Sequence, residues 1–98
     1  MTALRERVVV SPQAVPALPK HVRIQHDPVR QAFAVLSPEK VFWPNEISLE
    51  ILRRCDGGSS VEKIVADLAS EYNAPEEDVA ADVTAFIQEW SDKLLVKL

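Results

Sequence analysis

The chain has few of the residues that build nucleotide pockets or disulfide frameworks. Its 98 residues include two glycines, adjacent at Gly57 and Gly58, and one cysteine, Cys55. Loops that hold phosphate groups need several glycines at fixed spacing, so neither a dinucleotide-binding turn nor a P-loop is expected. A single cysteine cannot form an internal disulfide. These absences argue against a nucleotide-dependent enzyme and against a disulfide scaffold.

Long apolar runs are also missing. The longest, at residues 8–10 and 32–36, are far shorter than the ~20 residues that a membrane helix needs. No segment combines a basic start, an apolar centre and a small-residue cleavage site, which is the pattern of a secretory signal. We therefore expect a cytoplasmic protein with no membrane partner.

Groups suited to catalysis or metal binding are sparse. His21 and His26 lie around one short predicted strand, and no second cysteine or closely spaced histidine pair completes a zinc site. Cys55 falls in the apolar phase of a predicted helix, where a buried structural thiol is expected rather than a nucleophile. A chain this small also has little room for a pocket that would hold a general acid. We expect no enzyme activity, no metal and no cofactor.

The composition is otherwise that of one small folded domain. The hydrophobic fraction is 47% and the charged fraction 27%, which are ordinary values for a soluble globular protein. The net charge of −4 is unevenly distributed: residues 1–30 hold five basic and two acidic residues (+3), and residues 59–98 hold three basic and nine acidic residues (−6). Because nucleic-acid binders direct Lys and Arg at phosphate, no nucleic-acid partner is expected. Such acidic faces are usually solvated, and a basic peptide or protein patch is the functional alternative.

The start of the chain differs from the rest in its pattern. Residues 1–19 contain Pro12, Pro16 and Pro19 and show no sustained hydrophobic period. This pattern predicts a flexible N-terminal arm over residues 1–19. A single domain is expected over residues 20–98.

Three short strands are predicted next. Residues 21–25, 31–36 and 41–43 alternate polar with apolar side chains or carry bulky β-forming residues, and turn residues separate them. The short turns favour an antiparallel meander. Pro44 has no amide proton and closes the third strand, which suits an edge position.

Three helices are expected after the strands. Asn45 is a good N-cap for the first helix, which a diglycine stop ends. Ser59 and Glu62 match a capping box for the second, and Pro75 pre-sets the first turn of the third. The predicted apolar stripes of the three helices are Ile47, Ile51, Leu52 and Cys55; Val61, Ile64, Val65, Leu68 and Tyr72; and Val79, Val83, Phe86, Ile87, Trp90 and Leu94.

This order of elements indicates an α+β fold. A three-stranded antiparallel sheet followed by a three-helix bundle, with a glycine-containing turn between helices, is typical of a winged helix-turn-helix arrangement. A winged-helix DNA-binding regulator shares that architecture but needs a basic recognition helix. Lys63 is the one basic residue of the second predicted helix and Lys93 that of the third, so their charge disfavours this alternative.

A family resemblance rests on the stretch PEKVFWPNEISLEILRRCDG and the residue pattern around it. The matching residues are Leu36, Pro38, Glu39, Asn45, Glu50, Ile51, Leu52, Cys55, Asp56 and Gly57. On these residues the chain resembles the pyrroloquinoline quinone (PQQ) biosynthesis protein D (PqqD) family of small peptide-binding RiPP recognition elements. The similarity continues weakly over about residues 20–95. It implies the same winged architecture.

The resemblance also implies a function. A member of this family is a peptide chaperone that binds the ribosomally made precursor peptide (PqqA) by strand addition. It presents the peptide to the radical SAM enzyme (PqqE), which joins a Glu and a Tyr side chain. Delegating capture to a small module raises the effective concentration of the peptide at the enzyme. A recognition module for another modified peptide would have the same fold, so this alternative stays open.

The expected binding surface is the third strand with the third helix beside it. An edge strand displays unpaired N–H and C=O groups to which an extended peptide can add. Alternate side chains of the bulky third strand must point away from the core, although either Phe42 or Trp43 could instead belong to it. An open edge is compatible with a monomer or a weak dimer. The candidate peptide-binding residues are Val41, Phe42, Trp43, Val83, Ile87 and Trp90.

Overall fold

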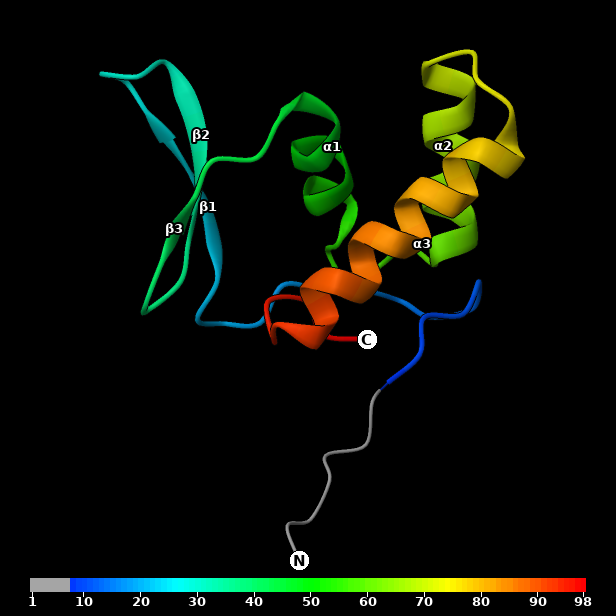
Figure 1. Ribbon diagram of the computed structural model, residues 1–98, viewed down its shortest axis with the longest axis horizontal. Coiled ribbons are helices and arrows are strands. Elements are labelled where there is room, and N and C mark those ends of the chain that lie inside the picture. Colours follow the sequence, from blue (N-terminus) through cyan, green and yellow to red (C-terminus); the bar gives the residue numbers. More distant parts are fainter. Residues whose placement is uncertain (1–7) are drawn as a thin grey trace, which may run out of the picture.

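A computed structural model describes residues 8–98, in which a three-stranded sheet is followed by three helices (Figure 1). The sheet is antiparallel with strand order β1-β2-β3. The predicted α+β architecture is confirmed, but the strand bounds differ. The first strand starts two residues later than expected, the second starts one residue later, and the third ends at Phe42 rather than at Trp43. The elements are β1 (Arg23–Asp27), β2 (Ala32–Leu36), β3 (Val41–Phe42), α1 (Glu46–Arg54), α2 (Val61–Glu71) and α3 (Glu76–Asp92).

The strand register gives the sheet one buried and one outer face. Ile24 pairs with Val35, and Val35 pairs with Phe42. Directly paired residues share a face, and Val35 is fully buried, so this row faces the helices. Leu36 and Val41 are paired on the opposite face, where the Val41 side chain is 53% exposed.

Side-chain caps fix the starts of the first two helices. The Oδ1 atom of Asn45 accepts a hydrogen bond from Ser48 N at 2.8 Å, which confirms the predicted cap of α1. For α2 the predicted Ser59 is wrong, because Ser60 is the N-cap and its Oγ accepts from Lys63 N at 3.1 Å. The two serines are adjacent and chemically equivalent, so the sequence pattern places the cap one residue early.

The hydrophobic core joins the three helices to the buried face of the sheet. In Figure 1, α2 and α3 lie side by side and α1 lies between them and the sheet. Most of the predicted apolar stripes are buried as expected. The largest fully buried side chains are Leu52, Ile64, Ile87, Val35, Val83 and Pro16.

Three residues of the predicted stripes are exposed instead. Ile47 lies in the first turn of α1, and Tyr72 follows the end of α2. Leu94 follows the end of α3 and has a φ of 64°, so the helical period no longer applies there. The chain turns at this point and buries Leu95 and Val96.

The segment at residues 8–19 is packed on the domain, contrary to the flexible arm expected from the sequence. Val10 is buried, and its N–H donates to Gln88 Oε1 at 3.0 Å. Ala17 and Lys97 exchange two backbone hydrogen bonds of 2.8 Å each. The remainder of the predicted arm, residues 1–7, lies outside the described residues.

The same segment supplies acceptors for the start of α2. Val61 N donates to Ala14 O at 2.8 Å, and Glu62 N donates to Pro12 O at 3.0 Å. The first N–H groups of a helix have no partner within the helix, so these carbonyls satisfy two of them. The prolines interrupt any hydrophobic periodicity of a strand or helix in this part of the sequence. The backbone carbonyl groups of the segment can nevertheless accept hydrogen bonds. This is why a pattern that suggests a loose arm belongs to a packed segment.

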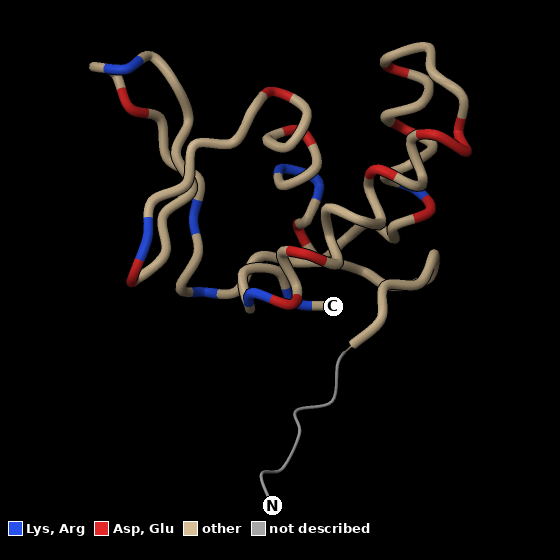
Figure 2. The backbone as a smooth tube through the Cα atoms, in the orientation of Figure 1, with Lys and Arg blue, Asp and Glu red and all other residues tan. Residues whose placement is uncertain are grey.

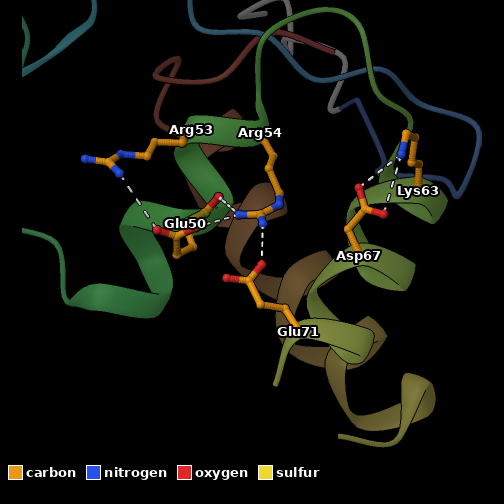
Figure 3. A network of polar contacts seen from close by, with 6 residues as sticks. All are labelled: Glu50, Arg53, Arg54, Lys63, Asp67 and Glu71. Atoms are coloured by element: carbon orange, nitrogen blue, oxygen red, sulfur yellow. Dashed lines mark hydrogen bonds and ion pairs between the residues drawn. The ribbon is translucent and has the colours of Figure 1, made fainter. Parts of the chain in front are cut away.

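An ion-pair network connects α1 to α2 (Figure 3). One guanidinium nitrogen of Arg54 lies 2.7 Å from Glu50 Oε2, and another lies 2.6 Å from Glu71 Oε2. The hydrogen bond to Glu50 is the main cause that raises the pKa of Arg54. A separate pair, Lys63 and Asp67 at 3.1 Å, lies along α2 alone. The first network therefore connects two helices, whereas the second stabilises one.

Candidate functional site

The sheet has two edge strands, β1 and β3, and the outer side of each meets no other strand in the part of the chain described. β3 is the edge strand that contacts α3, through the rings of Phe42 and Trp90, and its outer side is the open edge that concerns the candidate site. Ser37 N donates to Lys40 O at 3.0 Å at the base of the β2–β3 hairpin. Hydrogen-bonded and non-hydrogen-bonded residue pairs alternate along an antiparallel ladder. Since Ser37 and Lys40 are a hydrogen-bonded pair, the next pair, Leu36 and Val41, is a non-hydrogen-bonded one. Val41 therefore directs its N–H and C=O away from β2. Phe42 directs its own groups into the sheet.

Trp43 continues the open edge. A residue that precedes proline is favoured in the extended region, and Trp43 precedes Pro44. The alternation then directs the Trp43 backbone groups outward, like those of Val41. By the same alternation Pro44 would direct its groups toward β2, and because it has no N–H it cannot continue that pairing. The free backbone groups of this edge thus belong to Val41 and Trp43.

The outer face beside this edge carries a shallow apolar hollow of about 310 Å³. Val41 and Trp43 are the exposed large hydrophobic residues of its lining, at 53% and 42%. Arg30, in the β1–β2 turn, places its guanidinium carbon 4.6 Å from the centroid of the Trp43 ring, which is a cation–π distance. The lining residues are Gln25, His26, Asp27, Pro28, Ala34, Leu36, Val41 and Trp43.

On the inner side of the edge, three aromatic rings form a row from β3 to α3. The ring centroids of Phe42 and Trp90 are 5.3 Å apart, and those of Trp90 and Phe86 are 5.2 Å apart in a stacked arrangement. Phe42 and Phe86 are half-buried and Trp90 is buried. This aromatic row joins the inner side of β3 to α3 through ring contacts.

A second hollow lies where the β2–β3 hairpin meets the C-terminal end of α3. Its volume is about 250 Å³. A larger hollow of about 450 Å³ shares His21 and Leu94 with it and extends along the C-terminal segment. The hairpin that carries the open edge therefore borders a concave surface formed with the segment that follows α3. The lining residues of the smaller hollow are His21, Ser37, Pro38, Glu39, Lys93, Leu94 and Leu95.

The structure brings together four of the six candidate residues. Val41 and Phe42 form β3, Trp43 directly follows it, and Trp90 contacts Phe42. Val83 and Ile87 are 1% and 0% exposed, so they support α3 from within the core and have no surface to offer a ligand. Apolar residues at helical spacing identify the buried face of a helix. A prediction from that spacing therefore names core residues rather than surface residues.

Two residues of the site were not among the candidates. Phe86 belongs to the predicted stripe of α3, and its half-buried ring lies four residues before Trp90 on the same face. That spacing was a usable signal. No sequence signal marks Arg30, because its contact with Trp43 depends on the sheet that brings the β1–β2 turn to the end of β3.

Charge is separated between the two halves of the domain (Figure 2). Acidic residues are concentrated along the helices, while the sheet and its turns carry both signs. The β3 strand itself is uncharged. A ligand at this edge would therefore meet apolar side chains and backbone groups, with charge at its ends.

Reactive groups are unsuited to chemistry at this edge. Cys55 is buried, its Sγ donates to Ile51 O at 3.3 Å, and burial raises the pKa of its thiol to about 12. Within residues 8–98, no group of three or more His, Cys, Asp or Glu side chains is arranged to hold a metal ion. None of the helices in that range has both the length and the apolar character to cross a membrane.

Sequence comparison finds one family. The family model described as Coenzyme PQQ synthesis protein D (PqqD) matches residues 33–96. A protein of Rhodopseudomonas palustris (strain BisB5), named PqqA binding protein, is 41% identical over 86 residues, which cover 88% of this chain and 84% of that protein.

Two solved structures are similar to this chain. The solution structure of the PqqD truncation of Methylobacterium extorquens PqqCD, described as a functional and stand-alone RiPP recognition element, has a TM-score of 0.80 and 28% identity. The match covers 96% of this chain and 100% of that one. The crystal structure of PqqD from Xanthomonas campestris has a TM-score of 0.58 and 33% identity, and the match covers 92% and 100% of the two chains.

Proposed function

Because the chain belongs to the PqqD family, we propose that it is a peptide chaperone of PQQ biosynthesis that binds the precursor peptide PqqA. The peptide adds as a fourth strand along β3. The chain then presents the bound peptide to the radical SAM enzyme PqqE for crosslinking of a Glu and a Tyr side chain. The chain itself contributes affinity and position, and it performs no chemistry.

The open edge of β3 is the observation that carries this proposal. The outward N–H and C=O groups of Val41 and Trp43 are two residues apart, which is the spacing at which an added strand forms its hydrogen bonds. Main-chain pairing accepts almost any peptide sequence, so specificity must come from side chains. On the inner side, the peptide residue opposite Phe42 would share a face with the aromatic row of Phe42, Trp90 and Phe86.

Presentation to the enzyme needs a surface that the peptide leaves free. In Figure 1, α2 and the N-terminal end of α3 lie on the opposite side of the domain from β3. A bound peptide on β3 would leave those helices accessible. Holding the peptide near the enzyme raises its effective concentration there, which is how a module without catalytic groups assists a reaction.

NMR titration tests the proposal directly. An isotope-labelled sample of the chain is titrated with the precursor peptide and, as a control, with a scrambled peptide of the same composition. We expect amide shifts at residues 41–43 and along the exposed face of α3 near Phe86 with the precursor alone. Absence of any shift at near-millimolar peptide would overturn the proposal.

A proline at the edge tests the binding mode. Val41→Pro removes an N–H that the sheet does not use, so the fold should persist while one hydrogen bond to the peptide is lost. Val41→Thr keeps both the N–H and a β-branched side chain and is the matched control. Since one net hydrogen bond contributes ~1 kcal/mol, the proline variant should bind the peptide about fivefold more weakly. Equal affinity for both variants, with both folded, would exclude strand addition at Val41.

A further inference from the structure

We propose that Arg30, stacked on Trp43, recognises an acidic side chain of the bound peptide on the outer face of the sheet. This inference rests on the proposed strand addition at β3. It adds a specificity-determining residue from the β1–β2 turn, which lies outside both β3 and α3. The occupant of the outer face beside Trp43 is therefore a Glu or Asp residue of the peptide.

The turn holds Arg30 in place. Asp27 Oδ1 accepts hydrogen bonds from Val29 N at 2.9 Å and from Arg30 N at 3.3 Å. Gln31 completes the turn with a φ of 51°. The Asp27 oxygen is thus engaged by backbone groups of the turn, and the Arg30 side chain extends to the Trp43 ring, with 4.6 Å between the guanidinium carbon and the ring centroid.

The Arg30 guanidinium forms no ion pair with any described residue. Arg53 provides the internal comparison, because it also covers an aromatic ring, with its guanidinium carbon 4.4 Å from the centroid of Phe33. Arg53 has a carboxylate partner, Glu50, at 3.9 Å. Arg30 has the ring without the carboxylate, so its charge is available to a ligand.

Stacking leaves the donors of Arg30 free to bind. The flat face of a guanidinium lies against an aromatic ring, while its N–H groups point outward in the plane and match the two oxygens of a carboxylate. Trp43 thereby fixes the orientation of Arg30 and removes part of the entropy that ordering a long side chain would otherwise cost. The pair is a preorganised platform for an anion.

The register of an added strand places a side chain beside this platform. The peptide residue opposite Trp43 shares its face, with the two Cβ atoms ~5 Å apart. A Glu or Asp side chain at that position can reach the guanidinium of Arg30. The neighbouring outer-face residues Val41 and Leu36 are apolar. The carboxylate that also lines the hollow, that of Asp27, accepts two backbone N–H groups of the turn through its Oδ1 atom. A Lys or Arg at the same peptide position would be repelled.

Two variants of Arg30 separate charge from packing. Arg30→Met keeps an apolar stem on the Trp43 ring and removes the charge, whereas Arg30→Lys keeps the charge. Arg23→Met is the control, since Arg23 is an exposed cation at the start of β1, on the strand farthest from β3. We expect Arg30→Met to weaken binding of the precursor peptide about fivefold, in line with ~1 kcal/mol for one accessible ion pair. Arg30→Lys should lie between Arg30→Met and the unmodified chain, because it keeps the charge without the planar group, and Arg23→Met should leave binding nearly unchanged.

A double-mutant cycle then identifies the peptide residue. Each Asp of the precursor is replaced by Asn and each Glu by Gln, one at a time, and every peptide is titrated against the unmodified chain and Arg30→Met. One replacement should weaken binding to the unmodified chain and have no effect on Arg30→Met. If the unmodified chain binds no precursor, the proposed function itself fails. If it binds and no acidic replacement couples to Arg30, the function stands and this inference is overturned.

Discussion

The ring centroid of Phe42 lies 5.3 Å from that of Trp90, and this contact joins the shortest strand to the last helix. β3 pairs with β2 through only two residues, so the ladder alone holds it weakly. The aromatic contact fixes the distance between the open edge and α3. The open edge and the hydrophobic core therefore meet at one side chain, Phe42, while its neighbour Trp43 lines the hollow of the outer face.

Truncation of these two neighbours should give different results. Phe42→Ala removes a half-buried ring from the contact with Trp90 and should lower the free energy of unfolding by about 2 kcal/mol. Trp43→Ala removes a ring that is 42% exposed and should lower it by less than ~1 kcal/mol. Both variants should bind the peptide more weakly. Chemical denaturation and peptide titration of the two variants check this, and equal losses of stability would contradict it.

The packed N-terminal segment predicts a stability difference between two adjacent valines. Val10 is 8% exposed and Val9 is 72% exposed. Val10→Ala should lower the free energy of unfolding by about 1.5 kcal/mol, because it removes buried methyl groups. Val9→Ala should change it by less than ~0.5 kcal/mol. Urea denaturation measures both, and an unaffected Val10→Ala variant would mean that the segment does not pack in solution.

The order of the elements was predictable from local patterns. Asn45 could be predicted as the N-cap of α1 because it is a short polar residue directly before an apolar helical pattern. Pro44 could be predicted to limit β3 because it lacks an N–H. The packing of residues 8–19 was not predictable in this way. Its stabilising contacts, such as Val10 with Gln88, join residues that are 78 positions apart in the sequence.

The site was predictable only in part for a related reason. Val41 and Trp43 were identified because alternation along a strand is a local property. Periodicity along α3 identifies its buried stripe, which is why Val83 and Ile87 were selected although they are core residues. Arg30 reaches Trp43 only after the sheet has formed, so this contact depends on tertiary geometry that no spacing in the sequence encodes.

The network between α1 and α2 should contribute more to stability than a pair within one helix. The Arg54 side chain is 24% exposed and bonds both Glu50 and Glu71, whereas the Lys63 side chain is 61% exposed and pairs with Asp67 in its own helix. Arg54→Met should lower the free energy of unfolding by ~1 to 2 kcal/mol, because it leaves a partly buried carboxylate without its main partner.

Lys63→Met is the matched control, with an expected loss of ~0.4 kcal/mol. Thermal or urea denaturation at low and high salt measures both effects. The Lys63 pair should become negligible in high salt, while the Arg54 network, being less accessible to ions, should keep most of its effect. Equal losses for the two variants would show that the network adds nothing by connecting the helices.

The buried thiol predicts a loss of stability in alkaline solution. Burial is the main cause that raises the pKa of Cys55 from 9.0 to about 12, and the nearby charge of Asp56 adds to it. Between these values the unfolded chain has lost the proton and the folded chain still holds it. Raising the pH therefore favours unfolding across this range, and the stability that the thiol provides is fully present only below pH 9.

Cys55→Ala removes this dependence and serves as the comparison. Its own cavity lowers stability by an amount that does not vary with pH, whereas the unmodified chain should lose up to ~1.4 kcal/mol more per pH unit between pH 9 and pH 11. Subtracting one profile from the other removes the contribution of lysine and tyrosine ionisation, which is the same in both proteins. Urea denaturation at several pH values gives the two profiles. Parallel profiles would mean that the thiol ionises as easily in the folded chain as in the unfolded one, and that Cys55 is accessible to solvent.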